Sequence, residues 1–320
     1  MEQAVDQNPI KKGLTGQALK VIAVISMIID HIGYAILNRM PGVNDPGKLI
    51  SVIYMILRTI GRPAFPIFCF LLVEGFLHTR SVGKYAIRLF IFALISEIPF
   101  DLAFYGKPIS NNHQNVYFTL LIGVLVLWAF KKISSLDEKK LPKGLLYVAV
   151  MIIPPAYLTW SVERFITRKL DMYVSPALII PICAVIGLIL VYLAISRTSA
   201  KYNERTALIL CADLIVLSAA AWAADMLNID YASAGVIAIV VIYLYRTDRV
   251  TGIVYGCIAL TVLSSPLEIA ALPDAIAISK YNGRRGKGIK YLFYIIYPLH
   301  LAILYLIAYA MGLCTLPSVL

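Results

Sequence analysis

An aspartate and a histidine, Asp30 and His31, are adjacent within the first hydrophobic stretch of the chain, residues 18–37. A charged side chain deep in a membrane-spanning helix costs about 2.5–3.5 kcal/mol on insertion scales, so it marks a functional site by default. Because imidazole exchanges protons near neutral pH, His31 is the best available general base. Adjacent helical residues point about 100° apart, so we expect Asp30 to bridge to another helix. The alternatives are a neutral His31 hydrogen-bonded between helices and a purely structural Asp30 salt bridge.

Two further motifs combine charge with proline. Pro63 and Pro66 follow Arg62 and predict a break in the second apolar segment, where a guanidinium can hold a carboxylate or a phosphate bidentately. A simple proline kink is the alternative. Glu97 and Asp101 share a helix face at i,i+4, where like charges repel unless one is protonated or a cation intervenes. Such a pair can tune a base or form a structural ion pair with an arginine.

The composition shows what must position these groups. Of 320 residues, 60% are hydrophobic and 15% charged, with a mean hydropathy of +0.80, which excludes a soluble domain. Clear apolar spans lie near residues 17–38, 83–105, 115–132, 176–196, 206–224 and 289–311. Shorter or interrupted spans lie near 49–78, 145–160 and 231–245, and 251–279 crosses once or twice. We predict an all-α polytopic membrane bundle of 11 helices, with 10 as the alternative.

Lysine and arginine concentrate in alternate loops, which predicts a cytoplasmic N-terminus by the positive-inside rule. The basic residues 280–290 keep this pattern only if 251–279 crosses twice. Counted from the cytoplasmic helix ends at about 1.5 Å per residue, four ionisable groups on four helices fall about 17–22 Å deep. They are His31, Arg62, Glu97 and His300. We predict that they share one buried polar layer, because lipid supplies no partners to such groups.

Several short motifs resemble, in order, those of TraX-family membrane proteins. They include Asp30-His31-Ile32-Gly33, Gly61-Arg62-Pro63-Ala64-Phe65-Pro66, Glu74-Gly75-Phe76, Ser96-Glu97-Ile98-Pro99-Phe100-Asp101, Asn115-Val116-Tyr117, Asn282-Gly283-Arg284-Arg285 and Tyr297-Pro298-Leu299-His300. The family's named member is associated with N-terminal acetylation of a conjugative pilin subunit. The resemblance therefore implies a fold similar to multi-spanning acyltransferases and acetyl transfer from acetyl-CoA. Two departures are Ala232, which takes the place of a glycine, and residues 133–205, which look longer than the family pattern.

The resemblance and the chemistry together suggest roles. The expected catalytic residues are His31, Asp30, Glu97, Asp101 and His300. Candidates for contacting the substrate or stabilising an oxyanion are Arg62, Asn115, Tyr117 and Glu74. Candidates for the phosphates of acetyl-CoA are Asn282, Arg284, Arg285 and Lys287, although basic residues there also serve as a positive-inside anchor.

We expect one transmembrane domain, residues 1–320, with a cytoplasmic tail at 1–16. Motif-bearing helices occupy 17–132 and 280–311, and 133–205 is interpreted as a lineage-specific insert. The protein is expected in the lipid bilayer of the bacterial cytoplasmic membrane, transferring acetyl from acetyl-CoA to an amine or hydroxyl acceptor at or beyond the membrane. That acceptor is a protein N-terminus, a glycan or another envelope component. Direct transfer and an acetyl-histidine intermediate both stay open, as does a homo-oligomer.

Two other classes of function remain. Buried ionisable residues also mark proton-coupled transporters, although the halves of this chain show no paired repeats. A non-catalytic assembly protein would use the buried charges only for packing. No glycine-rich phosphate loop or Cys/His metal set is present, so we expect no metal. The net charge of +11 follows from the basic loops and gives no reason to expect nucleic acid.

Overall fold

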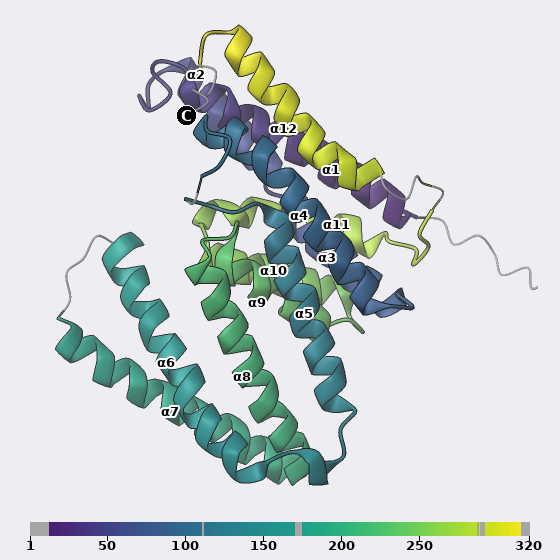
Figure 1. Ribbon diagram of the computed structural model, residues 1–320, viewed down its shortest axis with the longest axis vertical. Helices are drawn as coiled ribbons and strands as arrows, with labels where there is room; N and C mark the ends of the chain where they lie inside the picture. The colour runs from purple at the N-terminus through teal and green to yellow at the C-terminus, as the bar shows by residue number, and fades with distance from the viewer. Residues whose placement is uncertain (1–12, 111, 170–174, 287, 289–291, 315–320) are drawn as a thin grey trace, which may run out of the picture.

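The predicted helical membrane bundle is confirmed by a computed structural model, which describes residues 13–110, 112–169, 175–286, 288 and 292–314 (Figure 1). The helices are α1 (Gly16–Ala35), α2 (Leu49–Gly61), α3 (Ala64–His78), α4 (Val82–Tyr105), α5 (Val116–Ser134), α6 (Lys143–Lys169), α7 (Pro176–Lys201), α8 (Glu204–Met226), α9 (Ala232–Leu244), α10 (Arg249–Leu263), α11 (Asp274–Ser279) and α12 (Leu292–Ala310). Short 3₁₀ turns are η1 (Leu37–Arg39), η2 (Glu138–Lys140) and η3 (Pro266–Ala271). The described residues form no β-strand beyond two isolated bridges.

Within the described residues, seven helical segments are long and apolar enough to cross a membrane. One of them is α2 and α3 taken together, residues Leu49–His78. α4 is of spanning length but carries four charged residues, and α9 and α10 are apolar but shorter. These segments make the protein an integral membrane protein.

The predicted break in the second span is confirmed. α2 ends at Gly61, and α3 begins at Ala64 after Arg62 and Pro63. Proline cannot donate a backbone hydrogen bond, so the helix cannot run through this point unchanged. The break places the Arg62 side chain beside α1, where the Asp30 carboxylate lies.

The ambiguous segment 251–279 runs out and back. α10 is followed by η3 and α11, which return along it, and the Cys257 thiol donates to the Ala271 carbonyl at 3.6 Å. At the start of α10, the Arg249 guanidinium lies 5.1 Å from the ring centroid of Tyr281, which follows α11. This is the course that the 11-helix interpretation requires.

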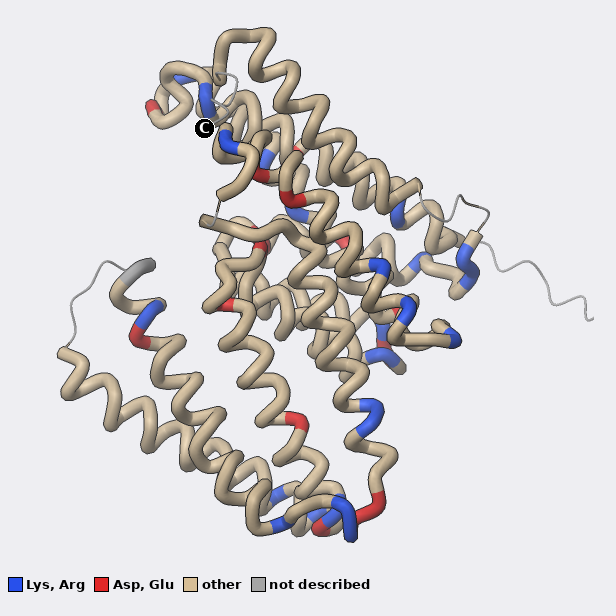
Figure 2. Tube along the Cα trace, in the orientation of Figure 1, with Lys and Arg blue, Asp and Glu red and all other residues tan. Residues whose placement is uncertain are grey.

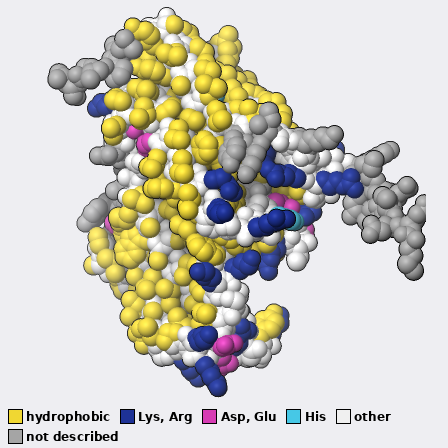
Figure 3. All heavy atoms as spheres, turned by 45° about the vertical axis from the view of Figure 1, so that its right-hand side comes forward, with side chains coloured by type: hydrophobic (Ala, Val, Ile, Leu, Met, Phe, Trp, Pro, Cys, Tyr) yellow, Lys and Arg dark blue, Asp and Glu magenta, His cyan; other side chains and the backbone are white. Residues whose placement is uncertain are grey.

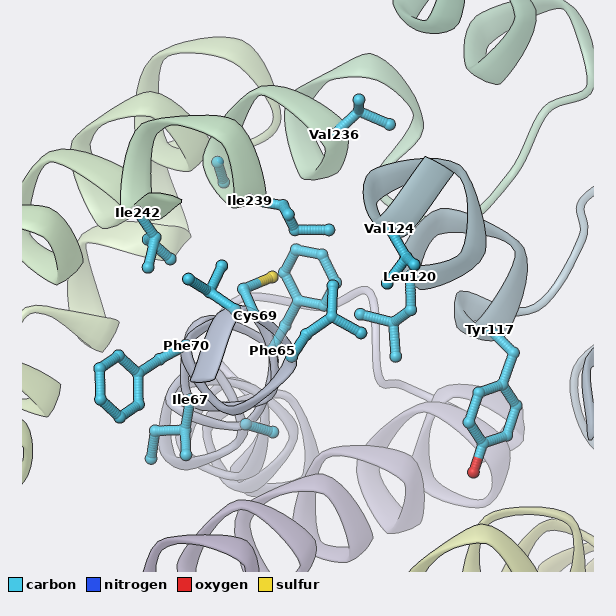
Figure 4. Close-up of a cluster of buried hydrophobic side chains, with 14 of the residues drawn as sticks. Phe65, Ile67, Cys69, Phe70, Tyr117, Leu120, Val124, Val236, Ile239 and Ile242 are labelled. Atoms are coloured by element: carbon cyan, nitrogen blue, oxygen red, sulfur yellow. The ribbon is translucent and has the colours of Figure 1, made fainter. Parts of the chain in front are cut away.

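The hydrophobic core surrounds α3, which packs against α1, α5 and α9 (Figure 4). Phe65 and Cys69 of α3 face Leu120 of α5 and Ile239 of α9, and all four are buried. α5 and α9 approach closely at Gly123, where a Cβ would lie 2.5 Å from the Cδ1 of Ile239. This packing fixes α3, and with it the break before it.

The hairpin of α6 and α7 stands apart from the rest of the bundle (Figure 1). α6 and α7 pack against each other and against α8. Their outer faces carry many exposed apolar side chains, as expected for surfaces that contact lipid.

Most lysines and arginines lie at one set of helix ends, which we call the basic end (Figures 2 and 3). It comprises the start of α1, the turns α3–α4, α5–α6, α7–α8 and α9–α10, and the loop after α11. The opposite set of helix ends, including the ends of α1, α4, α6, α8 and α10, is called the distal end.

Candidate functional site

The two membrane histidines form a hydrogen-bonded pair. Nδ1 of His31 on α1 lies 2.7 Å from Nε2 of His300 on α12, and the rings are nearly parallel, at 8°. Nδ1 of His300 lies 2.9 Å from the carbonyl oxygen of Ile296, which can only accept. In the neutral pair, Nδ1 of His300 therefore carries a proton, its Nε2 accepts from Nδ1 of His31, and Nε2 of His31 keeps a lone pair. No described residue forms a hydrogen bond with that nitrogen.

The pair formed by His31 and His300, called the dyad below, depends on the local structure of α12. Pro298 has no backbone N–H, so the carbonyl of Tyr294 loses its helical partner. The hydroxyl of Tyr117, on α5, donates to this carbonyl at 3.3 Å. The edges of the Phe104 and Tyr297 rings pack against His31 and limit its rotation. The pair is thus held by several helices rather than by α1 and α12 alone.

Asp30 points away from His31 and forms a buried charge cluster with α2, as its helical position predicted. One carboxylate oxygen accepts from Arg58 and the other from Arg62. Arg62 also donates from Nη1 to Oε1 of Glu268 on η3 at 2.7 Å, and from Nε to the backbone carbonyl of Arg58 at 2.9 Å. Glu268 is 1% exposed, and its other oxygen has no partner among the described residues. Two arginines and two carboxylates therefore balance in charge.

Gly61 permits this cluster, because a Cβ at that position would overlap the Cβ and carboxylate of Asp30. We expect Gly61→Ala to lower the free energy of unfolding by about 1–3 kcal/mol, the usual cost of overpacking. The measurement is thermal unfolding in detergent.

Gly83→Ala is the matched control, because a Cβ at this helical glycine meets nothing within 4 Å. It is expected to leave stability unchanged or slightly higher, since alanine favours helix. Equal unfolding temperatures for the two variants would contradict the close approach at Asp30.

A cavity of about 1000 Å³ joins the dyad to the charge cluster at the distal end. His31, Asp30, Arg58, Arg62 and Glu268 all line it. Its other walls come from the distal parts of α4, α6, α8, α9 and α10 and from Tyr297 of α12. A histidine nitrogen with a lone pair, guanidinium groups and a cavity of small-molecule size thus meet in one place.

Comparison with known protein families shows which family the chain belongs to. The family model described as "TraX protein" matches residues 15–163 and 170–308, nearly the whole chain. The chain belongs to the TraX family. The matched ranges include most of residues 133–205, whose interpretation as an insert stays a prediction.

A curated relative is the "Probable fimbrial assembly protein FimC, serogroup H1" of Dichelobacter nodosus, which is 38% identical over 122 residues. The match covers 34% of this chain and 43% of that relative, so the chain spans less than half of its length. No solved structure matches the chain.

The TraX-family motif residues do not all reach the cavity. Asn115 is the N-cap of α5, where its side-chain oxygen accepts from Tyr117 N at 3.0 Å. Its amide nitrogen donates to Glu97 and to the carbonyl of Ala93, which ties α4 to α5. Asp101 accepts from the backbone N–H of Ser110 at 2.7 Å. In this structure these side chains hold the loop between α4 and α5, and the candidate roles in catalysis for Glu97 and Asp101 stay predictions.

The remaining TraX-family candidates lie toward the basic end. Glu74, on α3, pairs with Arg249 through two contacts of 3.2 and 3.4 Å. The backbone carbonyls of Arg284 and Arg285 accept from the first residues of α1, and the side-chain oxygen of Asn282 accepts from Arg284 N. Lys287 lies outside the described residues, as do residues 1–12 of the expected tail.

Sequence reasoning missed three groups that line the cavity. Glu268 is a charged residue inside an apolar segment, so the criterion applied to Asp30 identifies it once η3 is treated as membrane-embedded. Arg58 is one turn before Arg62 and shares its helix face. His113 pairs with Asp230, which is 117 residues away in another loop. Such a pairing leaves no recognisable pattern in the sequence.

His113 lies at the distal mouth of the cavity, 3.6 Å from Oδ1 of Asp230. This carboxylate raises the pKa of His113, and burial opposes the rise only in part. The folded protein binds the His113 proton more tightly than the unfolded chain does. The pair of His113 and Asp230 therefore contributes its full stabilisation of the folded state when the pH is below the ordinary histidine pKa. This contribution to folding stability disappears as the pH rises through the raised pKa of His113.

We therefore expect the unfolding temperature of the wild type to fall, relative to His113→Gln, as pH rises from about 5.5 to 8, the range in which histidines titrate. The measurement is thermal unfolding of both proteins across that range. A temperature difference that does not change with pH would contradict the pairing.

Proposed function

We propose that this protein is a membrane acetyltransferase that uses His31 as its general base. The observation that supports this most is that His31, whose Nε2 has no hydrogen-bond partner among the described residues, lines one cavity together with Arg58 and Arg62. General-base catalysis needs a basic nitrogen within reach of the acceptor, and acyl transfer needs donors for the developing oxyanion. Both requirements meet at this site.

In the proposed reaction, Nε2 of His31 removes the proton from an acceptor hydroxyl or amine as the acceptor attacks the thioester carbon. The new bond joins the acceptor atom to the acetyl carbon. The carbon–sulfur bond then breaks, and the CoA thiolate takes the proton from His31. His300 acts as a positioning residue, since its Nε2 accepts from Nδ1 of His31 and holds the tautomer that this step requires.

The oxyanion lies toward the arginines in this proposal. Asp30 uses both oxygens on Arg58 and Arg62, which fixes the two guanidinium groups at the cavity wall. A guanidinium has five N–H donors, and Arg58 uses one of them on Asp30 within the described residues. The remaining donors are available to an oxygen of the reacting carbonyl. Arg58 thus joins Arg62 as a candidate for this role.

Acetyl-CoA is proposed to approach from the basic end, which the positive-inside rule assigns to the cytoplasm. Arg284 and Arg285 are exposed and lie beside the first residues of α1, with Gly16 N and Gln17 N donating to their carbonyls at 2.9 Å. From Gln17, His31 lies about 21 Å along α1 at 1.5 Å per residue. α1 and α12 pack together over this length, so phosphate-binding groups and the dyad lie at opposite ends of one helix pair.

The acceptor is proposed to enter from the distal end, where the cavity lies. The name of the Dichelobacter nodosus relative associates that protein with fimbrial assembly, and we extend to this chain a role in modifying a component of the cell envelope. The bacterial cytoplasmic membrane is the compartment that supplies acetyl-CoA on one side and envelope components on the other.

The proposal is tested with the full chain purified in detergent, by measuring acetyl-CoA binding and release of free CoA. We expect saturable binding and slow hydrolysis, as acyltransferases lacking an acceptor pass acetyl to water. A protein that binds no acetyl-CoA would overturn the proposal. Movement of protons across vesicles containing the protein, in the absence of CoA, would assign the buried charges to transport instead.

A further inference from the structure

The cavity lies between the helices that carry the charge cluster and the α6–α7 hairpin. One wall carries Asp30 and His31, whereas the opposite wall is the outer half of α6. Among the described residues, α6 and α7 pack on each other and on α8, and neither packs extensively against α2 or α10. The rim of the cavity here includes the apolar side chains of Val262 and Phe165, which are 64% and 40% exposed. Such a rim suits contact with hydrocarbon rather than water.

The α6 wall lies at the depth of the membrane interface. Tyr157, Trp160 and Trp222 have rings 6.1 and 5.9 Å apart near the distal ends of α6 and α8. Tyrosine and tryptophan gather where the hydrocarbon meets the lipid head groups. The mouth of the cavity is therefore level with the head groups of the distal leaflet.

Arg164 lines this same wall without an acidic partner among the described residues. Its guanidinium lies 4.5 Å from the ring centroid of Trp160, which orients it but leaves its N–H donors unused. A guanidinium is the side chain best shaped to bind a phosphate. A partly buried cation that no acidic side chain of the described residues pairs with is a candidate site for an anion.

Two carboxylates, those of Asp225 and Asp230, also line the cavity, and neither forms an ion pair with Arg164. Asp225 accepts from the hydroxyl of Tyr157 and from the backbone N–H of Ser233, both at 3.1 Å. Asp230 accepts from the backbone N–H of Tyr231 and pairs with His113. Both partners of Asp225 are neutral, so Arg164 and Asp225 are the charged groups here without an oppositely charged partner among the described residues. Arg164 is the one of the two that can bind an anion.

We propose that the cavity binds, as the acceptor for acetyl transfer, a membrane lipid with a phosphate head group and a free hydroxyl. The phosphate lies against Arg164, the hydrocarbon tail leaves between α6 and α2, and the hydroxyl reaches toward Nε2 of His31. The acceptor role rests on the proposed function, whereas binding of the lipid does not. In the transfer, the hydroxyl oxygen bonds to the acetyl carbon, the thioester bond breaks, and the hydroxyl proton passes through His31 to the CoA thiolate.

A protein N-terminus fits this wall less well. An amino terminus is cationic at neutral pH and would leave the guanidinium of Arg164 without an anion. A soluble phosphate compound would gain nothing from the open apolar rim. A phosphate-bearing lipid uses both features at once.

Tryptophan fluorescence tests the site, because Trp160 lies under Arg164. The full chain is reconstituted in phosphatidylcholine vesicles containing a minor fraction of phosphatidylglycerol with brominated tails, which quench tryptophan on contact. Matched vesicles carry brominated phosphatidylcholine. We expect extra quenching by the anionic lipid, and loss of that extra quenching in Trp160→Phe and in Arg164→Gln.

Arg246→Gln is the matched control. Arg246 also lies on an aromatic ring, that of Tyr243, at 4.6 Å, but it belongs to the basic end. The extra quenching should survive in this variant. Equal quenching by the two brominated lipids in the wild type, or its removal by an equal concentration of glycerol phosphate, would overturn the lipid site.

Acetyl-CoA turnover is measured on the same vesicles, so the two proposals can fail separately. Turnover without selective quenching would leave the acetyltransferase and remove the lipid site. Selective quenching without turnover would leave a lipid site and remove its role as acceptor. Acetylation of a peptide N-terminus without selective quenching would assign the acceptor to protein.

Discussion

His31→Gln is expected to lower acetyl-CoA-dependent turnover by at least about 100-fold, the lower range of what a general base contributes. Glutamine keeps a polar side chain of similar length but cannot accept and release a proton at neutral pH. His300→Gln should cause a smaller loss, of about 10–100-fold, as is typical when the residue that orients a reacting group is removed. Because His300 acts through the tautomer of His31, its variant should also change the pH dependence of turnover. The measurement is free CoA release by purified protein.

The control for both variants is His78→Gln. His78 ends α3, and its Nδ1 contacts the carbonyl of Glu74 at 2.8 Å, the same local geometry that His300 has with Ile296. It does not line the cavity. Turnover should therefore stay near the wild-type value, and all three variants should remain in the membrane fraction. Wild-type turnover in His31→Gln would sink the assignment of His31 as the base.

Asp30→Ala is expected to lower the free energy of unfolding by about 3–5 kcal/mol, because two arginines lose the carboxylate they share in a buried site. The side chains of Asp30 and Arg62 are only 10% and 8% exposed, so water in the cavity replaces the lost partner only in part. Unfolding of the detergent-solubilised protein by heat or denaturant measures the change.

Asp45→Ala is the matched comparison. Asp45 pairs with Lys48 at 2.5 Å, but the two side chains are 57% and 61% exposed. Exposed pairs contribute about 0–1 kcal/mol, so this variant should unfold near the wild type. If Asp30→Ala were as stable as Asp45→Ala, the cluster would contribute little, and Arg58 and Arg62 would be held by other contacts.

The depth of the buried groups in the membrane can be predicted from the sequence, whereas the residues that each group contacts are harder to predict. Rise per residue is constant in a helix, so His31, Arg62 and His300 were placed in one layer, and the structure brings all three to the same region. Glu97 was placed in that layer too, yet it contacts Asn115 at the start of α5. The depth of a residue follows from its position along one helix. Whether two residues are in contact also depends on how each helix is rotated and tilted. Those angles depend on packing between helices, which no single segment encodes.

The break before α3 was predictable because proline acts locally. Glu268 was not, because its segment reads equally well as one irregular span or as two short ones, and only the packed structure turns η3 toward Arg62. The roles expected for Asn115 as an oxyanion donor stay untested for a similar reason. An asparagine that precedes an apolar helix serves equally well as its N-cap, and in this structure Asn115 does so.

Among the described residues, the hairpin of α6 and α7 packs extensively only against α8. Sequence changes in the hairpin therefore affect different parts of the site than changes in the other helices do. The hairpin supplies a wall of the cavity, but neither member of the histidine dyad nor any member of the Asp30 charge cluster belongs to it. Mutations and length changes in the hairpin can therefore alter what fits beside the reacting groups without disturbing those groups. In the proposed acetyltransferase, changes confined to the hairpin would therefore change the acceptor while His31 and the charge cluster stay the same.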